Sequence, residues 1–239
     1  MPGRIVLRSD TGNAPLTSTP PSEKAFNAPL IAVLIAASMP LLFIAQEQLP
    51  DGGLSLAFRP ASLADGSWWP GVLTAMFLHL GWGHVAMNAT GAIAFGPPVA
   101  RLMPGLKGAL GFLLFYMACG VVAAVGFGLL HIDSQSVAVG ASGAVFGLTG
   151  AAIRLLGRRN GSLRALTDRR VLTISLILMG VNLVLGLLPF APGSDGAPVA
   201  WEAHAFGYLF GLLAIGPWSR IFRRRSGFDS ATDPGDPSV

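Results

Sequence analysis

Charged residues are scarce in this sequence. Only 12% of its 239 residues are Asp, Glu, Lys or Arg, about half the share that is typical of soluble domains. Hydrophobic residues make up 52% of the chain, and the mean hydropathy is +0.60. A soluble or disordered chain of this length would carry far more charge, so the composition indicates an integral membrane protein.

Cysteine is nearly absent, and no internal repeat is visible. The single Cys119 excludes an intrachain disulfide. The lack of a repeat counts against the inverted-repeat folds of many transporters. Although the pI is near 10.0, the basic residues lie between apolar runs rather than in one basic domain, so we expect no nucleic-acid partner.

Six apolar stretches are each close to the ~20 residues that cross a bilayer. They are 28–45, 82–100, 108–130, 137–153, 171–190 and 203–218. No small-x-small cleavage site follows the first stretch, which is therefore predicted to be an uncleaved anchor. We predict an all-α, polytopic membrane domain of six transmembrane helices over residues 28–222. It lies between a polar tail at 1–27, expected to be disordered, and a second tail at 223–239.

The basic residues lie on one side of this six-helix topology. Fifteen of the 16 fall in the two tails and in the loops after the second and fourth stretches, and only Arg59 falls on the other side. The positive-inside rule then predicts that both termini are cytoplasmic. Arg outnumbers Lys 14 to 2, which together with abundant Ala and Gly indicates a GC-rich bacterial genome and hence the cytoplasmic (inner) membrane.

Four polar residues interrupt the apolar pattern at a similar depth. His84 and Asn88 lie in the second stretch, Ser142 in the fourth and His204 in the sixth. At 1.5 Å per helical residue they lie about 20–26 Å above the basic residues that follow them. Ionisable groups inside a membrane are functional candidates by default, so we predict one site assembled from three helices.

Glycines near the serine and the sixth-stretch histidine would let their helices approach each other. Two small-xxx-small pairs of the kind found between packed membrane helices follow these residues: Gly143 and Gly147, and Gly207 and Gly211. If these faces meet, Ser142 Oγ and a ring nitrogen of His204 could share a hydrogen bond, as a base-activated nucleophile requires. Gly140 would let the chain turn before Ser142, at a helix start where free N–H groups face a developing oxyanion.

Three other polar residues have simpler interpretations. His79 is expected to make a structural hydrogen bond in the loop before the second stretch. His131, in an outer loop, is expected to be solvated, and it is the alternative to His204 as the base. Asn182 in the fifth stretch is interpreted as an interhelical tie rather than as a catalyst.

Three short motifs stand in order along the chain. The first spaces His79, His84 and Asn88 before and within the second stretch. The second is Gly-Ala-Ser-Gly-Ala-Val-Phe-Gly at 140–147, and the third is Ala-His-Ala-Phe-Gly-Tyr-Leu-Phe-Gly at 203–211. Together they resemble the motifs of the rhomboid family of intramembrane serine proteases, over roughly residues 68–218.

The resemblance implies a rhomboid-like bundle in which a Ser142–His204 dyad cleaves peptide bonds without a third acidic residue, a cofactor or a metal. His84, Asn88 and the Ser142 backbone N–H would form the oxyanion hole. Phe146, one turn after the serine, would pack on the catalytic histidine. The glycines named above would support the site by packing, and the histidine that opens the first motif would do the same.

The sequence departs from the family at one place and leaves two rival functions open. The outer loop 51–78 contains Trp68-Trp69-Pro70-Gly71 where many relatives have Trp-Arg. One rival is a proteolytically inactive relative that binds membrane proteins, although such relatives have typically lost the Ser or the His. The other rival is a small transporter or channel, against which the lack of repeats counts.

The depth of the serine predicts the substrates. A membrane helix must unwind to expose a peptide bond, so we expect single-span membrane proteins with Gly, Ala, Ser or Pro in the outer third of the span. Substrates are expected to enter past the fifth stretch, with the loop 189–199 and its three prolines as a movable cap. Beyond these substrates and the lipid bilayer, the sequence indicates no partner, and it sets no oligomeric state.

Overall fold

The structure, a computed structural model, describes residues 29–158, 161–188 and 196–222. Both predicted tails, 1–27 and 223–239, lie outside the described residues, as does most of the predicted cap loop 189–199. The described part of the chain contains helices joined by loops and no strand, with one isolated antiparallel bridge between Phe58 and Ala138. The all-α class predicted from the sequence is therefore confirmed.

Six helices lie at the six predicted stretches. They are α1 (Leu30–Gln46), α4 (Trp82–Ala100), α5 (Gly105–Leu130), α6 (Ser142–Ile153), α7 (Arg169–Leu187) and α8 (Trp201–Phe222). Among the described residues, three helices are both long and apolar enough to cross a membrane, namely α5, α7 and α8. The count of six spans therefore stays a prediction.

Four short helices fill the loop between α1 and α4. They are η1 (Leu54–Leu56), α2 (Ser62–Asp65), α3 (Gly71–Thr74) and η2 (Ala75–Phe77). The tryptophans of this region, expected to lie at the membrane interface, are exposed: Trp68, Trp69 and Trp82.

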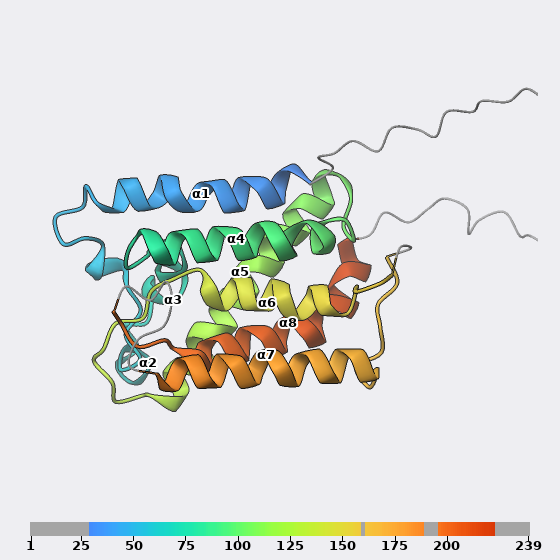
Figure 1. Cartoon of the computed structure of the whole chain (residues 1–239). Helices are drawn as coiled ribbons and strands as arrows, with labels where there is room; N and C mark the ends of the chain where they lie inside the picture. Colours follow the sequence, from blue (N-terminus) through green and yellow to red (C-terminus); the bar gives the residue numbers. More distant parts are fainter. Residues whose placement is uncertain (1–28, 159–160, 189–195, 223–239) are drawn as a thin grey trace, which may run out of the picture.

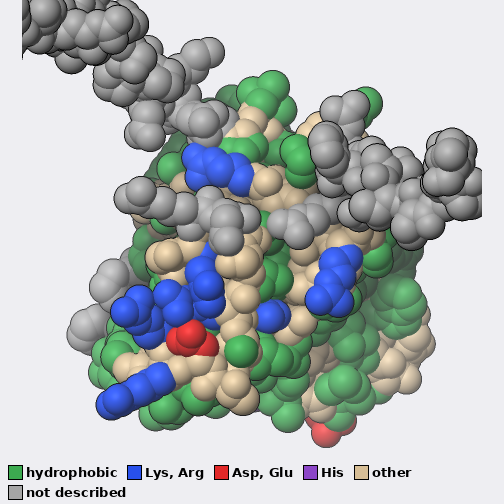
Figure 2. Space-filling model, turned by 90° about the vertical axis from the view of Figure 1, so that its right-hand side faces the viewer, with side chains coloured by type: hydrophobic (Ala, Val, Ile, Leu, Met, Phe, Trp, Pro, Cys, Tyr) green, Lys and Arg blue, Asp and Glu red, His purple; other side chains and the backbone are tan. Residues whose placement is uncertain are grey.

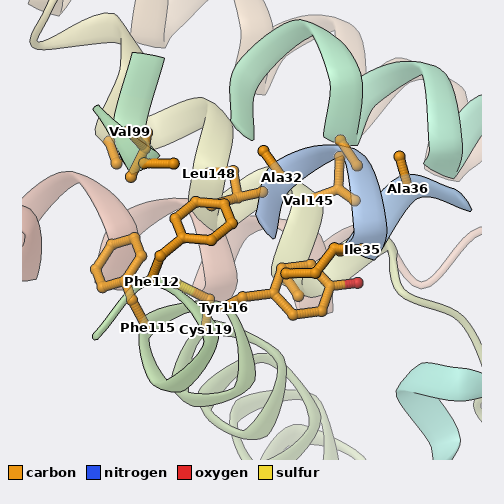
Figure 3. Close-up of a cluster of buried hydrophobic side chains, with 14 of the residues drawn as sticks. Ala32, Ile35, Ala36, Val99, Phe112, Phe115, Tyr116, Cys119, Val145 and Leu148 are labelled. Atoms are coloured by element: carbon orange, nitrogen blue, oxygen red, sulfur yellow. The ribbon is translucent and has the colours of Figure 1, made fainter. Parts of the chain in front are cut away.

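Helix α6 lies at the centre of the bundle, with α4, α5 and α8 packed around it (Figure 1). Ten of its 12 residues are buried. The main core cluster joins α6 to α1, α4 and α5. In it, Phe112 of α5 and Ala32 of α1 lie beside Leu148 of α6 (Figure 3), and all three side chains border Gly96 of α4.

Helix α7 lies at the edge of the bundle and packs mainly on α8. Only Val171 and Asn182 of its 19 residues are buried. Ile174, Leu178 and Met179 are partly buried, and most of its other apolar side chains, such as Leu176 and Leu187, are exposed. The helix is therefore held by few side chains on one face, in contrast to α6.

The start of α6 differs from the prediction. The apolar pattern predicted a helix from Val137, but the helix begins at Ser142. The residues before it are extended, because Ala138 exchanges two backbone hydrogen bonds with Phe58 and the Gly140 N–H donates to Ala75 O. At 12 residues, α6 is about 18 Å long, so its first residue lies inside the bundle rather than at its outer end.

Basic side chains gather at one end of the bundle, where α7 begins and α8 ends (Figure 2). Arg154 donates to the carbonyls of Arg164 and Leu212 and so joins the end of α6 to α8. Asp168 caps α7 by accepting from the Arg170 N–H at 2.9 Å. The hydrogen bond from Arg164 holds the pKa of the Asp168 carboxyl below its ordinary value. Basic side chains outnumber acidic ones at this end of the bundle (Figure 2), and the Asp168 carboxylate is paired with Arg164.

Candidate active site

Ser142 is the first residue of α6 and lies within hydrogen-bond distance of a histidine from α8. Its Oγ is 2.8 Å from His204 Nε2. The turn into the helix needs Gly140, whose φ of +125° is in a region that L side chains rarely adopt. A Cβ at Gly140 would also lie 2.6 Å from His84 Cε1, so the glycine is required both by its backbone and by its neighbour.

The approach of α6 and α8 depends on their glycine pairs. A Cβ at Gly207 would overlap the Gly143 carbonyl oxygen, and one at Gly211 would overlap the Gly147 carbonyl oxygen. The two small-xxx-small faces therefore meet backbone to backbone, as such pairs do between membrane helices. This contact brings the start of α6 level with the first turn of α8, where His204 lies.

The His204 ring is fixed on two further sides. The Phe146 ring is stacked on it, with centroids 4.3 Å apart and planes 6° from parallel. Asn182 Oδ1 of α7 lies 2.8 Å from His204 Nδ1. From its sequence position, Asn182 was predicted only to tie helices together, and its contact with the histidine was not predicted. The feature of the sequence that could have indicated this contact is the presence of an amide side chain in an otherwise apolar stretch.

Side chains of α4 line the other side of the serine. Gly91 of α4 packs against Val145, one turn after Ser142, so the α4 face that carries His84 and Asn88 is turned toward α6. Asn88 is 4% exposed, and its Nδ2 has no hydrogen-bond partner among the described residues. The Leu80 N–H lies 3.5 Å from His84 Nδ1. If Nδ1 accepts there, the neutral ring carries its proton on Nε2, on the side of Gly140.

The contacts of two other histidines differ from those predicted. His79 was expected to make a structural hydrogen bond, but neither of its buried ring nitrogens has a partner in the described part of the chain. Only its backbone is bonded, to the Gln46 amide. The ring packs edge-on against His84, with centroids 5.2 Å apart, so it supports that ring by contact.

His131 was expected to be solvated, and 39% of its side chain is exposed. In addition, its Nε2 lies 3.2 Å from Glu202 Oε1 at the start of α8, and its ring packs against Phe127, contacts that were not predicted. The structure pairs Ser142 with His204, not with His131. Within the described ranges, no three His, Cys, Asp or Glu side chains cluster as metal ligands would.

The fold and the site define an integral membrane protein whose polar residues are gathered inside an apolar helical bundle. The family model described as "Rhomboid domain" matches residues 65–220, a range that includes Ser142 and His204. The chain therefore belongs to the rhomboid family, and the resemblance noted in its sequence is confirmed.

Individual relatives agree with this assignment. Rhomboid protease GluP of Bacillus subtilis (strain 168) is 33% identical over 158 residues, which cover 61% of this chain and 29% of GluP. Rhomboid-like protein 11, chloroplastic, of Arabidopsis thaliana is 35% identical over 151 residues, covering 62% of this chain and 51% of that protein. The rhomboid protease YdcA of Bacillus subtilis (strain 168) is 28% identical over 151 residues, which cover 63% of this chain and 67% of YdcA. The matched part of the chain thus spans two thirds of YdcA but less than a third of GluP.

Proposed function

We propose that this protein is an intramembrane serine endopeptidase that works through a Ser142–His204 dyad. Ser142 attacks the peptide carbonyl, and His204 acts first as general base and then as general acid to the leaving amine. The observation that carries the proposal is the 2.8 Å between Ser142 Oγ and His204 Nε2, since proton transfer requires hydrogen-bond distance. The relatives named as rhomboid proteases support it.

The proposed oxyanion hole combines donors from two helices. The Ser142 backbone N–H is one of the free donors at the start of α6. Asn88 Nδ2 has no protein partner among the described residues, and a proton on His84 Nε2 would make that ring a further donor. Donors that are oriented before the substrate binds stabilise the developing charge without reorganisation.

We further propose that the substrates are single-span membrane proteins cut near the outer face. This proposal rests on the distance of the two residues from the basic end. His204 is 16 helical residues from Arg220 in α8, about 24 Å. The sequence placed Ser142 about 24 Å above the basic residues. In the structure this height is about 18 Å, because α6 ends at Ile153 rather than continuing to Arg158. Both residues then lie in the outer half of a hydrocarbon core of ~30 Å.

The proposed membrane is the bacterial cytoplasmic membrane, with six spans and both termini on the cytoplasmic side. The gathering of Arg side chains at one end supports this orientation (Figure 2). The alternation of basic loops along the sequence supports the six spans. Substrates would approach past α7, the helix with the fewest buried residues among the six.

A serine-directed fluorophosphonate probe tests the dyad in the purified protein. We expect labelling of the wild type, no labelling of Ser142→Ala, and strongly reduced labelling of His204→Ala. Ser142→Ala removes a single hydroxyl and should keep the melting temperature of the wild type, whereas His204→Ala also removes the ring stacked on Phe146 and should lower it by a few degrees without unfolding the protein. His131→Ala is the matched control for the base, and it should label and cleave as the wild type does.

Two outcomes contradict the dyad. Equal loss of labelling in His131→Ala and His204→Ala, with both variants folded, would reject the assigned base. A folded wild type that neither takes up the probe nor cleaves a reconstituted single-span protein would instead support the inactive, binding relative.

Helix-stabilising changes in a cleaved substrate test the proposed depth. Replacing its Gly, Ala, Ser or Pro residues in the outer third by Leu should slow cleavage, because the chain must unwind to reach Ser142. The same replacements in the inner third are the matched control and should have little effect. Equal cleavage of an all-Leu span, or a cut near the cytoplasmic end, would contradict the proposal.

A further inference from the structure

Asn182 is the one buried polar residue in the middle of α7, and both ends of its amide are bonded to α8. Its side chain is 3% exposed. Nδ2 donates to the backbone carbonyl of Trp201 at 2.8 Å, and Oδ1 lies 2.8 Å from His204 Nδ1. The amide thus bridges the start of α8 and the histidine three residues later.

These two bonds determine the protonation of the histidine ring step by step. The Trp201 carbonyl can only accept, so the atom of Asn182 that faces it must be Nδ2. Oδ1 therefore faces His204, and because an amide oxygen only accepts, Nδ1 of the ring must carry the proton. In the neutral ring Nε2 is then unprotonated, and it lies 2.8 Å from Ser142 Oγ.

We propose that Asn182 is a positioning residue that holds His204 in the Nδ1–H tautomer, with the Nε2 lone pair directed at Ser142. This inference rests on the proposed function, in which Nε2 takes the serine proton. A third group that fixes the tautomer of a catalytic histidine is usually a carboxylate. Here a neutral amide has that role, and a backbone carbonyl fixes the amide.

The positioning residue comes from a different helix than the dyad. Helix α7 contacts α8 through residues on one face: Ser175, bonded to the Tyr208 hydroxyl; Asn182; and Gly186, against which the Trp201 ring packs. A movement of α7 away from α8 would remove the Oδ1 acceptor and leave His204 free to take the other tautomer. The state of the base therefore depends on the position of α7.

A purely structural tie between the helices makes different predictions from a positioning residue. The Ser175–Tyr208 bond joins the same two helices but does not touch His204, so Ser175→Ala is the matched control. If Asn182 only tied α7 to α8, Ser175→Ala and Asn182→Leu would lower stability and activity to a similar extent.

We expect Asn182→Leu to lower kcat roughly 10- to 100-fold, the scale of losing one hydrogen bond to a group that becomes charged, with KM little changed. Ser175→Ala should stay within about twofold of wild type, because the bond it removes does not touch the reacting groups. Asn182→Asp should recover part of the activity, because a carboxylate also accepts from Nδ1 but cannot donate to the Trp201 carbonyl. Since the carboxylate stabilises the protonated imidazole, the acidic limb of the kcat/KM profile should move to higher pH in this variant.

Nitrogen-15 NMR of the histidine rings, recorded in the Ser142→Ala background, reads the tautomer without any turnover. We expect a protonated Nδ1 and an unprotonated Nε2 for His204, and a mixture of tautomers once Asn182→Leu is added. An unchanged tautomer in that variant, or an equal kcat loss in Ser175→Ala, would overturn the inference while leaving the dyad intact. Full activity of Ser142→Ala would instead overturn the proposed function.

Discussion

Helix α8 contacts α6 and α7 in very different ways. Toward α6 it presents Gly207 and Gly211, and the two backbones touch with no room for a single methyl group. Toward α7 it presents side chains: the Trp201 ring packs on Gly186, and the Tyr208 hydroxyl is bonded to Ser175. Since only two residues of α7 are buried, this contact is made by a few side chains rather than by the backbone, and α7 is the more loosely held helix.

This difference separates the parts of the proposed site. The nucleophile and its base belong to the tightly packed pair, so their 2.8 Å separation is set by backbone contact. Asn182, which orients the base, belongs to the loosely held helix. We infer that the distance within the dyad is rigid, whereas the tautomer of the base can respond to the movement of one peripheral helix.

The largest effect should come from breaking the tight face. Gly207→Val or Gly211→Val forces α6 and α8 apart, because each new side chain overlaps a carbonyl oxygen. We expect activity below detection and a melting temperature lower by roughly 5–10 °C, the scale of overpacking in a core. Thermal unfolding and a cleavage assay measure both.

Gly180→Val is the control for adding a valine to a helix where no other element is contacted. Because its Cβ meets nothing within 4 Å, both stability and activity should remain close to those of the wild type. Retained activity in Gly207→Val would contradict the tight α6–α8 contact, and equal damage in Gly180→Val would show that the loss comes from the valine and not from that contact.

The next largest effect should come from the proposed oxyanion donors of α4, which lie outside the α6–α8 contact. Asn88→Ala and His84→Ala each remove one proposed oxyanion donor without touching α6–α8 packing, so turnover should decrease while the dyad remains. A loss of ~10²–10³-fold in kcat is usual for one such donor. Steady-state kinetics check this, with the exposed Met87→Ala of the same helix as control. Wild-type kcat in both variants and in the double variant would remove them from the site.

A smaller effect should follow from changing the ring stacked on the base. Phe146→Leu keeps an apolar side chain within the α6–α8 contact but removes the aromatic stack on His204. Aromatic pairs contribute about 0.5–1.5 kcal/mol beyond burial, so we expect kcat to fall roughly 2- to 10-fold. Phe146→Tyr keeps the ring and should retain most activity. Equal losses in both variants would indicate that the stack is not the cause.

The smallest effect concerns the basic end of the loose helix. Asp168→Ala removes the cap of α7 and should lower the melting temperature at pH 7 by at most a few degrees. Because the folded protein lowers the pKa of this carboxyl, its contribution is complete above about 3.9, the ordinary value for Asp. It is lost as the pH falls below that value. Thermal unfolding at pH 7 and near pH 3 should show the two proteins converging; a constant difference would contradict this assignment.

The sequence predicted the parts of the molecule that depend on local signals. Sparse charge and regularly spaced basic loops indicated the helical membrane fold, and glycine pairs four residues apart indicated that the faces after Ser142 and His204 could meet. The roles of these residues stay proposals. The predicted start of α6 was wrong. Residues 137–141 are as apolar as the helix that follows them, and they are extended because Ala138 pairs with Phe58, about 80 residues earlier in the chain.

The contacts of Asn182 and His131 could not be predicted for a related reason. Each depends on how one element is rotated against α8, and spacing within a single helix does not set that rotation. The bonds to His204 and to Glu202 therefore emerge only in the three-dimensional structure. The depth of Ser142 estimated from the sequence was too large for a similar reason, since hydropathy did not show that α6 ends at Ile153.

The short length of α6 has a consequence for the bilayer around the protein. Hydrocarbon averages ~30 Å across, while α6 measures about 18 Å and α5, with 26 residues, about 39 Å. Since α6 is enclosed by protein, it has no hydrophobic mismatch with lipid; the outer helices adjust to membrane thickness by tilting. The height of Ser142 above the basic end is then constant in thin and thick membranes. A substrate span, in contrast, follows the lipid, so a thicker bilayer would move the cut along the substrate toward its middle.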